Sequence, residues 1–395
     1  MTKIAVIGGG ISGLVLTHRL LELKKEKNAD FEIVLFEAGT RLGGVFETEK
    51  KDGFILEKGP EAFLSDRPAI LDLCERLGLK EELIHTNPKH RNCLVVQKGR
   101  LVEWSRGFDP AEQSNSWLFL RGRTEPPRYK LFLSFRNGME ELAQALIHKI
   151  PPQIFSLSRR VQEIFFDATK QKWTLTFSSG EKEEVDVVCL TAPAKSSAGM
   201  LRKFSTGLSE KLGQISYESV ASLNLAYRLE DIENPLQAFG FVVPAPVVGP
   251  GPASENLPFM ACTFVHRKFE HRAPEGFALL RAFVGGAWGK KCFEKNDYEI
   301  KESVHQGLST LLGIRREPYF SILKRYPDSM VQYRLNHLEL VSEIEASLRK
   351  INGLFLCGSS YRGVGIPDCI EGAENTAERI YETLLLPPIR KFQRS

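Results

Sequence analysis

The stretch KIAVIGGGISGLVLTHRLLE at residues 3–22 most constrains the fold, because three consecutive glycines interrupt an otherwise apolar pattern. The pattern predicts a buried strand over residues 3–8 and a helix over residues 11–26. FEIVLFE at residues 31–37 predicts a second strand, which completes a β-α-β unit. Glycine weakens helices and strands alike. The bare backbone between these elements therefore indicates that another group, such as a phosphate, approaches it closely.

The glycines match the pattern G-x-G-x-x-G of dinucleotide-binding turns. In this pattern Gly8 permits the tight turn, Gly10 lets the backbone approach a pyrophosphate, and Gly13 lets the helix pack on the sheet. Glu37 ends the second strand, where its carboxylate can accept hydrogen bonds from ribose hydroxyls. The predicted dinucleotide contacts of this turn also include Ile11 and Ser12.

A second glycine pair follows in EAGTRLGGVFET at residues 37–48, where Gly43 and Gly44 predict another close backbone approach to the same dinucleotide. Ala38 and Arg41 complete the segment, and a solvated surface arginine is the alternative for Arg41. This arrangement resembles the flavoprotein family that includes amine oxidases, phytoene desaturases and protoporphyrinogen oxidases. The resemblance implies FAD rather than NAD.

The segment FLCGSSYRGVGIPDCIEGAENTAERI at residues 355–380 repeats the order strand, glycine-rich turn, helix. In the family such a segment passes beneath the flavin ring, which implies that Val364, Gly365 and Ile366 lie along it. Asp368 is expected to cap a helix beginning at Cys369. The positive end of this helix would then face the part of the ring that becomes negative on reduction.

Five stretches, the last of them within residues 355–380, resemble protoporphyrinogen oxidases: LEKGPEAFL (56–64), LSFRNGMEELAQAL (133–146), HRAPEGFALLRAFVGG (271–286), RYPDSMVQYRLNHLELVSEIE (325–345) and YRGVGIPDCIEGAENTAE (361–378). The resemblance implies oxidation of protoporphyrinogen IX to protoporphyrin IX in haem biosynthesis, with oxygen or a quinone accepting the electrons. Oxidation of coproporphyrinogen III to coproporphyrin III shares these motifs and stays open. The glycine motifs are also compatible with an amine oxidase, a carotenoid desaturase or a non-catalytic flavoprotein.

The resemblance also implies roles for single residues. Further FAD contacts are expected at Gly59, Pro60 and Val161. Phe269 is expected to stack on a pyrrole ring, and Phe241 and Val243 to sandwich the macrocycle. The family places an arginine near the hairpin predicted at residues 93–104 to hold a substrate carboxylate; Cys93 stands at that position in one register, and the nearby Arg91 is expected to substitute. Plain core packing is the alternative for Phe269, Phe241 and Val243. No catalytic side chain or metal site is expected, because the flavin supplies the redox chemistry.

The predicted fold is α/β plus α+β: a Rossmann-like FAD-binding domain built from discontinuous segments, and a substrate domain with an antiparallel sheet. The FAD-binding domain is expected to comprise residues 1–75, 135–205 and 350–395, and the substrate-binding domain residues 76–104 and 206–349. Residues 105–134 form a shortened loop where the family has a long helical, membrane-binding segment. We expect the shortening of this segment to affect substrate binding and membrane docking.

The bulk numbers exclude several classes. A net charge of +4 on 395 residues gives no reason to expect nucleic acid. The seven cysteines are scattered without a C-x-x-C spacing, which disfavours a disulfide framework or a zinc site. The first strand begins at Lys3, so no signal peptide is expected. We expect a cytoplasmic protein, with peripheral contact at the membrane's cytoplasmic face left open, and the sequence does not determine the oligomeric state.

Overall fold

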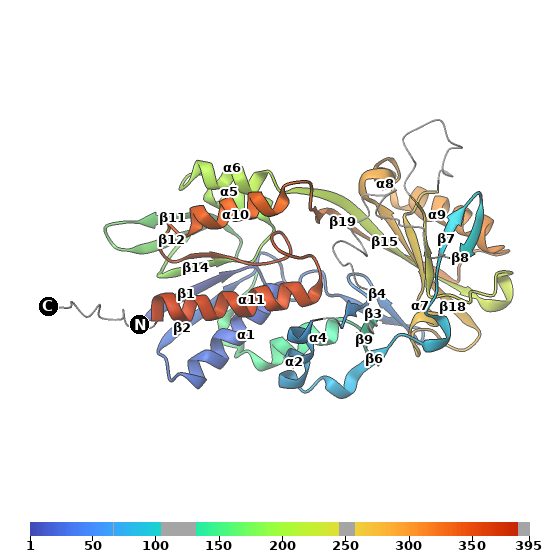
Figure 1. The fold of residues 1–395 in the computed structure, drawn as a ribbon, viewed down its shortest axis with the longest axis horizontal. Coiled ribbons are helices and arrows are strands. Elements are labelled where there is room, and N and C mark those ends of the chain that lie inside the picture. The colour runs from blue at the N-terminus through green and yellow to red at the C-terminus, as the bar shows by residue number, and fades with distance from the viewer. Residues whose placement is uncertain (66, 104–131, 245–256, 386–395) are drawn as a thin grey trace.

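Two sheets organise the chain, whose structure is a computed structural model that describes residues 1–65, 67–103, 132–244 and 257–385. The first sheet is entirely parallel and has the order β10-β2-β1-β14-β20. Its strands are β1 (Thr2–Ile7), β2 (Phe31–Phe36), β10 (Phe155–Ser156), β14 (Val187–Leu190) and β20 (Leu354–Leu356). Figure 1 shows this sheet on the left, with α1 (Ile11–Glu26) and α11 (Ile366–Ile380) in front of it.

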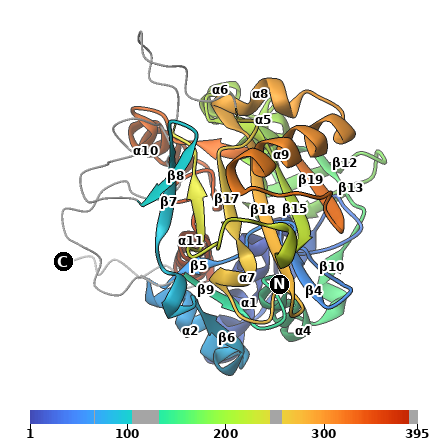
Figure 2. The same cartoon turned by 90° about the vertical axis from the view of Figure 1, so that its right-hand side faces the viewer.

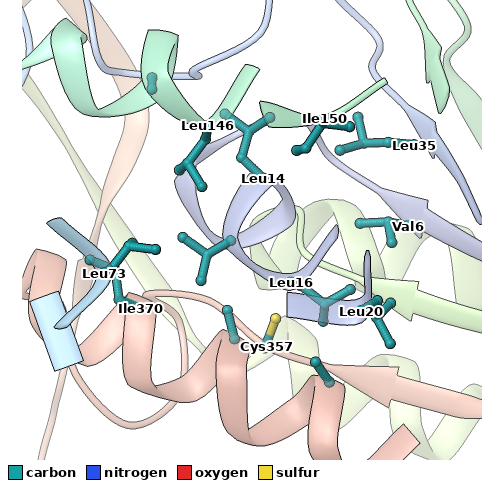
Figure 3. Packing of buried hydrophobic residues seen from close by; sticks show 14 of the residues in the cluster. Val6, Leu14, Leu16, Leu20, Leu35, Leu73, Leu146, Ile150, Cys357 and Ile370 are labelled. Atoms are coloured by element: carbon teal, nitrogen blue, oxygen red, sulfur yellow. The ribbon is translucent and has the colours of Figure 1, made fainter. Parts of the chain in front are cut away.

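Both faces of the parallel sheet are buried, which explains why its strands are continuous apolar runs rather than alternating ones. Ile4 and Val6 of β1 point into a core shared with α1, α2 (Pro68–Leu77), α4 (Glu140–Lys149) and α11; Figure 3 shows this packing around Val6. Ala5 and Ile7 point into the opposite core. That second core is covered by α5 (Ala194–Leu201), α6 (Thr206–Gly213), α10 (His337–Leu348) and the small sheet β11 (Val161–Asp167), β12 (Lys172–Phe177) and β13 (Lys182–Val185).

The second large sheet has seven strands in the order β19-β15-β18-β17-β16-β7-β8. These are β7 (Cys93–Gln97), β8 (Arg100–Glu103), β15 (Ser216–Arg228), β16 (Gly240–Val242), β17 (Ala261–Phe264), β18 (Phe277–Gly285) and β19 (Phe320–Gln332). The pairing is antiparallel except between β16 and β7, so the sheet is mixed rather than wholly antiparallel. Figure 2 faces this end of the molecule, where α8 (Gly286–Phe293) and α9 (Asp297–Leu312) accompany the sheet.

Several short elements lie outside the two large sheets. They are the hairpin of β3 (Thr48–Lys51) and β4 (Phe54–Glu57), the helix α7 (Val265–Lys268), and a small sheet of β5 (Phe63–Leu64), β9 (Phe132–Phe135) and β6 (Leu83–His85). Phe54 and Leu56 of β4 pack with Ala226 of β15 and Leu279 of β18, which joins the hairpin to the second sheet. Residues 57–61, which begin at the last residue of β4, therefore lie at the junction of the two parts.

The structure confirms the predicted fold class: a Rossmann-like parallel sheet is combined with a mainly antiparallel second sheet. The strands of each sheet fall within the segments predicted for that domain, but α6 and α10, predicted for the substrate-binding domain, pack in the core of the parallel sheet. The domain boundaries themselves remain a prediction. Most of the predicted 105–134 loop lies outside the described residues. Within the described ranges, none of the helices has the length and apolarity needed to cross a bilayer.

Candidate active site

The first glycine turn joins β1 to α1. Each of its three motif glycines suits its position for a different structural reason. Gly8 has φ +121°, and a Cβ there would lie 2.8 Å from Thr191 Oγ1. A Cβ on Gly13 would lie 1.9 Å from the Gly8 carbonyl oxygen, so the helix packs directly on the turn. Gly10 is different: it caps α1 without a side-chain hydrogen bond, and a Cβ there would meet nothing within 4 Å. Open space at a helix N-terminus suits a phosphate group.

The second glycine pair lies on the first turn. The Gly43 N–H donates to the Gly9 carbonyl oxygen over 2.8 Å, and a Cβ on Gly44 would lie 3.2 Å from Gly10 Cα. Both Gly43 and Gly44 have positive φ, +95° and +58°. The structure thus brings together two glycine turns that are more than thirty residues apart in the sequence.

Arg41 shapes the loop that carries the second pair. Its guanidinium donates to the carbonyl oxygens of Leu42 at 3.0 Å and Phe46 at 3.1 Å, and also to that of Gly44. The side chain is part-exposed beside Glu47. Arg41 is therefore more than a solvated surface arginine, and its direct contact with FAD remains a prediction.

Glu37 follows β2 and faces the first turn. One carboxylate oxygen accepts from the Gly9 N–H and the other from the Gly39 N–H, both over 2.7 Å. A carboxylate has about four acceptor positions, so capacity for ribose hydroxyls remains. Ala38 lies exposed beside it.

The predicted adenine contact, Val161, begins β11 close to this loop. The backbone N–H groups of Arg159 and Ser158 donate to the carbonyl oxygens of Glu37 at 3.0 Å and Gly39 at 2.8 Å. The N-terminal part of β11 is thereby tied to the end of β2, where an adenosine would lie in a Rossmann-like site. The role of Val161 remains a prediction.

The C-terminal turn reaches the same region. Gly358, after β20, has φ +131°, and a Cβ there would lie 3.8 Å from Ser12 Oγ at the start of α1. Ser12 also interacts with the Cys369 side chain of α11. The two helices remain joined further along, where Arg19 donates to Glu378 over 2.7 Å. The N-termini of α1 and α11 therefore converge, and their dipoles favour negative charge between them.

The predicted start of the last helix was wrong by three residues. The helix begins at Ile366 rather than Cys369, with Gly365 as its N-cap and Pro367 in its first turn. Asp368 does help to cap it, because the carboxylate accepts from the Gly365 N–H over 3.2 Å. Val364 precedes the cap and is exposed. Proline restricts the residue before it but suits a first helical turn, and the sequence reasoning did not use that preference.

The Gly59–Pro60 turn packs on the loop that follows Gly44. A Cβ on Gly59 would lie 1.7 Å from the Val45 carbonyl oxygen, so only glycine fits there. The contacts therefore run without a break from Gly10 through Gly44 and Val45 to Gly59. Taken together, the open space at Gly10, the two helix N-termini and the free acceptor capacity of Glu37 fit an extended dinucleotide such as FAD.

Beside this turn lies a group of buried charges that the sequence reasoning missed. Glu61 is 9%, Lys268 5% and Arg281 2% exposed. Lys268 Nζ lies 2.5 Å from one Glu61 oxygen, and Arg281 Nη1 lies 3.5 Å from the other. Burial alone would raise the pKa of Glu61, but Lys268 and Arg281 reverse this and lower it. The sequence does contain one indication of this group, because Arg281 interrupts the otherwise apolar strand FALLRAFVG.

A second buried pair stands nearby. Arg272 donates to Ser134 Oγ and the Phe135 carbonyl oxygen, both over 2.8 Å. Glu57 accepts from the Met139 N–H over 2.7 Å and from Thr48 Oγ1 over 2.8 Å. Burial raises the pKa of Glu57 to about 7 despite the nearby Arg272.

The four predicted substrate residues lie in different surroundings. Phe269 is buried next to Lys268, whose Nζ lies 5.4 Å from the ring centroid. Phe241 is also buried, with its ring against Phe259 and Phe264, and Val243 packs on the same core. Both therefore have the packing contacts of core residues, and their contact with a macrocycle remains a prediction.

Arg91 lies exposed, directly after the short 3-10 helix Pro88–His90 and before β7. Separately, a cavity of about 590 Å³ lies between α10, β20 and α11 and is bordered by Arg362, Gly363 and Asp368. None of Val364, Gly365 and Ile366 lines it, so this cavity flanks the C-terminal turn rather than forming the predicted flavin site.

Sequence comparisons show that two known protein families match this chain. The family described as "Flavin containing amine oxidoreductase" matches residues 90–381, and the family described as "NAD(P)-binding Rossmann-like domain" matches residues 6–77. A crystal structure from Exiguobacterium sp. 255-15 superposes with a TM-score of 0.80 at 23% identity, covering 96% of this chain and 98% of that one. The solved structure thus shares the fold.

Two relatives match over almost the whole chain. "Coproporphyrinogen III oxidase" of Bacillus subtilis (strain 168) is 26% identical over 460 residues, covering 93% of this chain and 95% of the relative. "Protoporphyrinogen oxidase 1, chloroplastic" of Arabidopsis thaliana is 22% identical over 484 residues, covering 95% and 87%. Both alignments are longer than the 395 residues of this chain, so each relative contains residues opposite gaps. The expectation that the shortened segment is residues 105–134 remains a prediction.

Proposed function

Because the chain belongs to the flavin-containing amine oxidoreductase family and binds FAD as that family does, we propose that it oxidises a porphyrinogen to the corresponding porphyrin. The proposed substrate is coproporphyrinogen III, and protoporphyrinogen IX is the second candidate. The observation that carries the proposal is the match over nearly the full length to the Bacillus subtilis coproporphyrinogen III oxidase, with glycine turns in place for the cofactor. This order of candidates corrects our preference from sequence motifs alone for protoporphyrinogen IX, because the coproporphyrinogen oxidase match has the higher identity.

Each end of the chain contributes a defined part of the proposed cofactor site. The backbone around Gly10 and the N-terminus of α1 would hold the pyrophosphate, and Glu37 would accept hydrogen bonds from a ribose. Val364, Gly365 and Ile366 would lie along the ring, with the N-terminus of α11 favouring negative charge there. When bound, the flavin supplies the redox chemistry by accepting a hydride equivalent from the substrate.

The side chains that meet the substrate would position it rather than react with it. Phe269, which is buried in the structure, would stack on a pyrrole ring, and Arg91 would bind a propionate. Coproporphyrinogen III carries more propionates than protoporphyrinogen IX. A guanidinium at Arg91 that met the substrate would therefore favour coproporphyrinogen III.

The overall reaction removes six electrons and six protons from the macrocycle. Three successive two-electron oxidations achieve this, with the substrate tautomerising between rounds so that each new C–H bond meets the same position. With oxygen as the acceptor, each round produces one hydrogen peroxide; a quinone acceptor would instead produce the quinol. We propose oxygen as the acceptor and keep a quinone as the alternative.

The test is a comparison of the two porphyrinogens with the flavin-loaded protein. Porphyrin fluorescence is followed in air, and loss of the oxidised flavin absorbance is followed without oxygen. Faster turnover of coproporphyrinogen III supports the proposal, and faster turnover of protoporphyrinogen IX reverses the order of the candidates. If neither substrate bleaches a fully loaded flavin, the chain is a non-catalytic flavoprotein. Addition of a quinone to the anaerobic assay identifies the acceptor.

A further inference from the structure

The turn at residues 57–61 is held by its carbonyl oxygens. Asn224 Nδ2 donates to the Glu57 carbonyl over 2.9 Å, and Ser222 Oγ donates to the Lys58 carbonyl over 2.7 Å. Arg281 Nη2 donates to the carbonyls of Lys58, over 3.1 Å, and of Gly59. Ser134 Oγ donates to the Glu61 carbonyl over 2.8 Å. Buried side chains of β9, β15 and β18 thus fix this turn against the neighbouring glycine loop.

The charges of the buried side chains around this turn do not cancel one another. Lys268 and Arg281 share the single carboxylate of Glu61, which leaves one positive charge. Arg272 and Glu57 do not remove it, because the positive charge of Arg272 at least balances the charge of Glu57, whose pKa is about 7. The five buried groups therefore carry a net positive charge at neutral pH, whether Glu57 is ionised or protonated.

The surroundings of Lys268 keep this charge away from water. Its Nζ lies 4.3 Å from the ring centroid of Phe132, 5.6 Å from that of Phe239 and 5.4 Å from that of Phe269. Ring faces attract a cation, so they partly compensate for its lost hydration. In such a dry site a charge acts on its neighbours more strongly than it would in water.

Arg281 also has unused bonding capacity. Its Nε is buried and has no hydrogen-bond partner among the described residues, although its Nη atoms are bonded. A buried donor without a partner is costly. The unpartnered donor and the uncompensated charge both favour an electron-rich group beside the Gly59–Pro60 turn.

We propose that Lys268, Arg281 and Glu61 form a positioning cluster whose net positive charge stabilises the reduced flavin beside the Gly59–Pro60 turn. Reduction by two electrons with uptake of one proton leaves a flavin ring with one additional negative charge. A nearby positive charge lowers the free energy of that anion and so raises the midpoint potential. The inference rests on FAD binding and on the position of the turn, and it does not depend on which porphyrinogen is oxidised.

The test compares two variants of opposite charge, Lys268→Met and Glu61→Gln, as flavin-loaded proteins. Dithionite titration against a reference dye gives the midpoint potential of each bound flavin. Lys268→Met removes a positive charge and is expected to lower the potential, while Glu61→Gln removes a negative charge and is expected to raise it. A purely structural role predicts no such dependence on sign.

The matched control is Lys170→Met, which removes an exposed lysine in the turn before β12 that pairs with Glu184 of β13 over 2.6 Å. It should leave the potential unchanged. Shifts of the same sign in the two cluster variants, or no shift in either, would overturn the inference. If Lys268→Met folds but loses its flavin, or if it does not fold, the sign of the Glu61→Gln shift decides.

Discussion

Glu57 gives the chain a stability that depends on pH, and Glu57→Gln should remove this dependence. The carboxyl group is buried at the end of β4 and receives hydrogen bonds from the Met139 N–H and from Thr48 Oγ1. Burial disfavours its charged form and raises its pKa from 4.5 to about 7. The folded protein therefore holds this proton more tightly than the unfolded chain does.

The sign and size of the effect follow from proton linkage. Because the folded-state pKa is raised, the stability is fully present below about pH 4.5 and is lost as the pH rises towards 7. At about 1.4 kcal/mol per pKa unit, the whole shift corresponds to roughly 3 kcal/mol. Between pH 5 and pH 8 the loss should be about 2 to 3 kcal/mol.

The assay is urea unfolding followed by circular dichroism at pH 5 and pH 8, with FAD in equal excess throughout. A glutamine amide resembles the protonated carboxyl, so Glu57→Gln should be more stable than the parent at pH 8 and similar to it at pH 5. The control Asp52→Asn removes an exposed carboxylate from the β3–β4 turn and should keep the parent's pH dependence. If Glu57→Gln lost stability between the two pH values as steeply as the parent, the reasoning about Glu57 would be refuted.

Three further predictions concern single residues. Gly10→Val should abolish FAD retention while the chain stays folded. The control Gly199→Val, at an equally open position, should release as much flavin on denaturation as the parent does. A fully loaded Gly10→Val protein would contradict the pyrophosphate position. Gly13→Ala should lower the melting temperature even of the apoprotein, because its Cβ would overlap the Gly8 carbonyl, and an unchanged melting curve would disprove that packing. Phe269→Leu should raise KM for the porphyrinogen and leave the flavin content intact, and unchanged steady-state kinetics would remove Phe269 from the substrate wall.

Local patterns allowed much of the cofactor-binding part to be predicted. The strand, the glycine turn and the helix at residues 2–26 follow from an apolar run, backbone freedom and helical periodicity, all of which act over short distances. The strand β20 and the helix α11 near the C-terminus are indicated by the same local pattern of apolar run, glycine turn and helical periodicity. FAD followed from the second glycine pair and from the family resemblance, and the fold class was correct.

Contacts between distant segments were not accessible in this way. The sequence placed Gly44 after a strand, but only the folded chain sets it on Gly10. The sequence made Phe241 a candidate for the macrocycle; in the structure its ring packs on Phe259 and Phe264, and its contact with a macrocycle remains a prediction. An apolar side chain has the same local pattern in a core as in a binding site, so periodicity cannot distinguish the two.

The sequence by itself determined that this chain builds a dinucleotide-binding parallel sheet, because the glycines and the apolar strands encode that unit locally. Only the tertiary structure decided that Glu61, Lys268 and Arg281, from three separate segments, meet beneath one turn. A charged residue looks the same in sequence whether it ends in water or in a core. Its contribution to the free energy of folding and to the electrostatics of the site depends on its burial and on partners more than two hundred residues away.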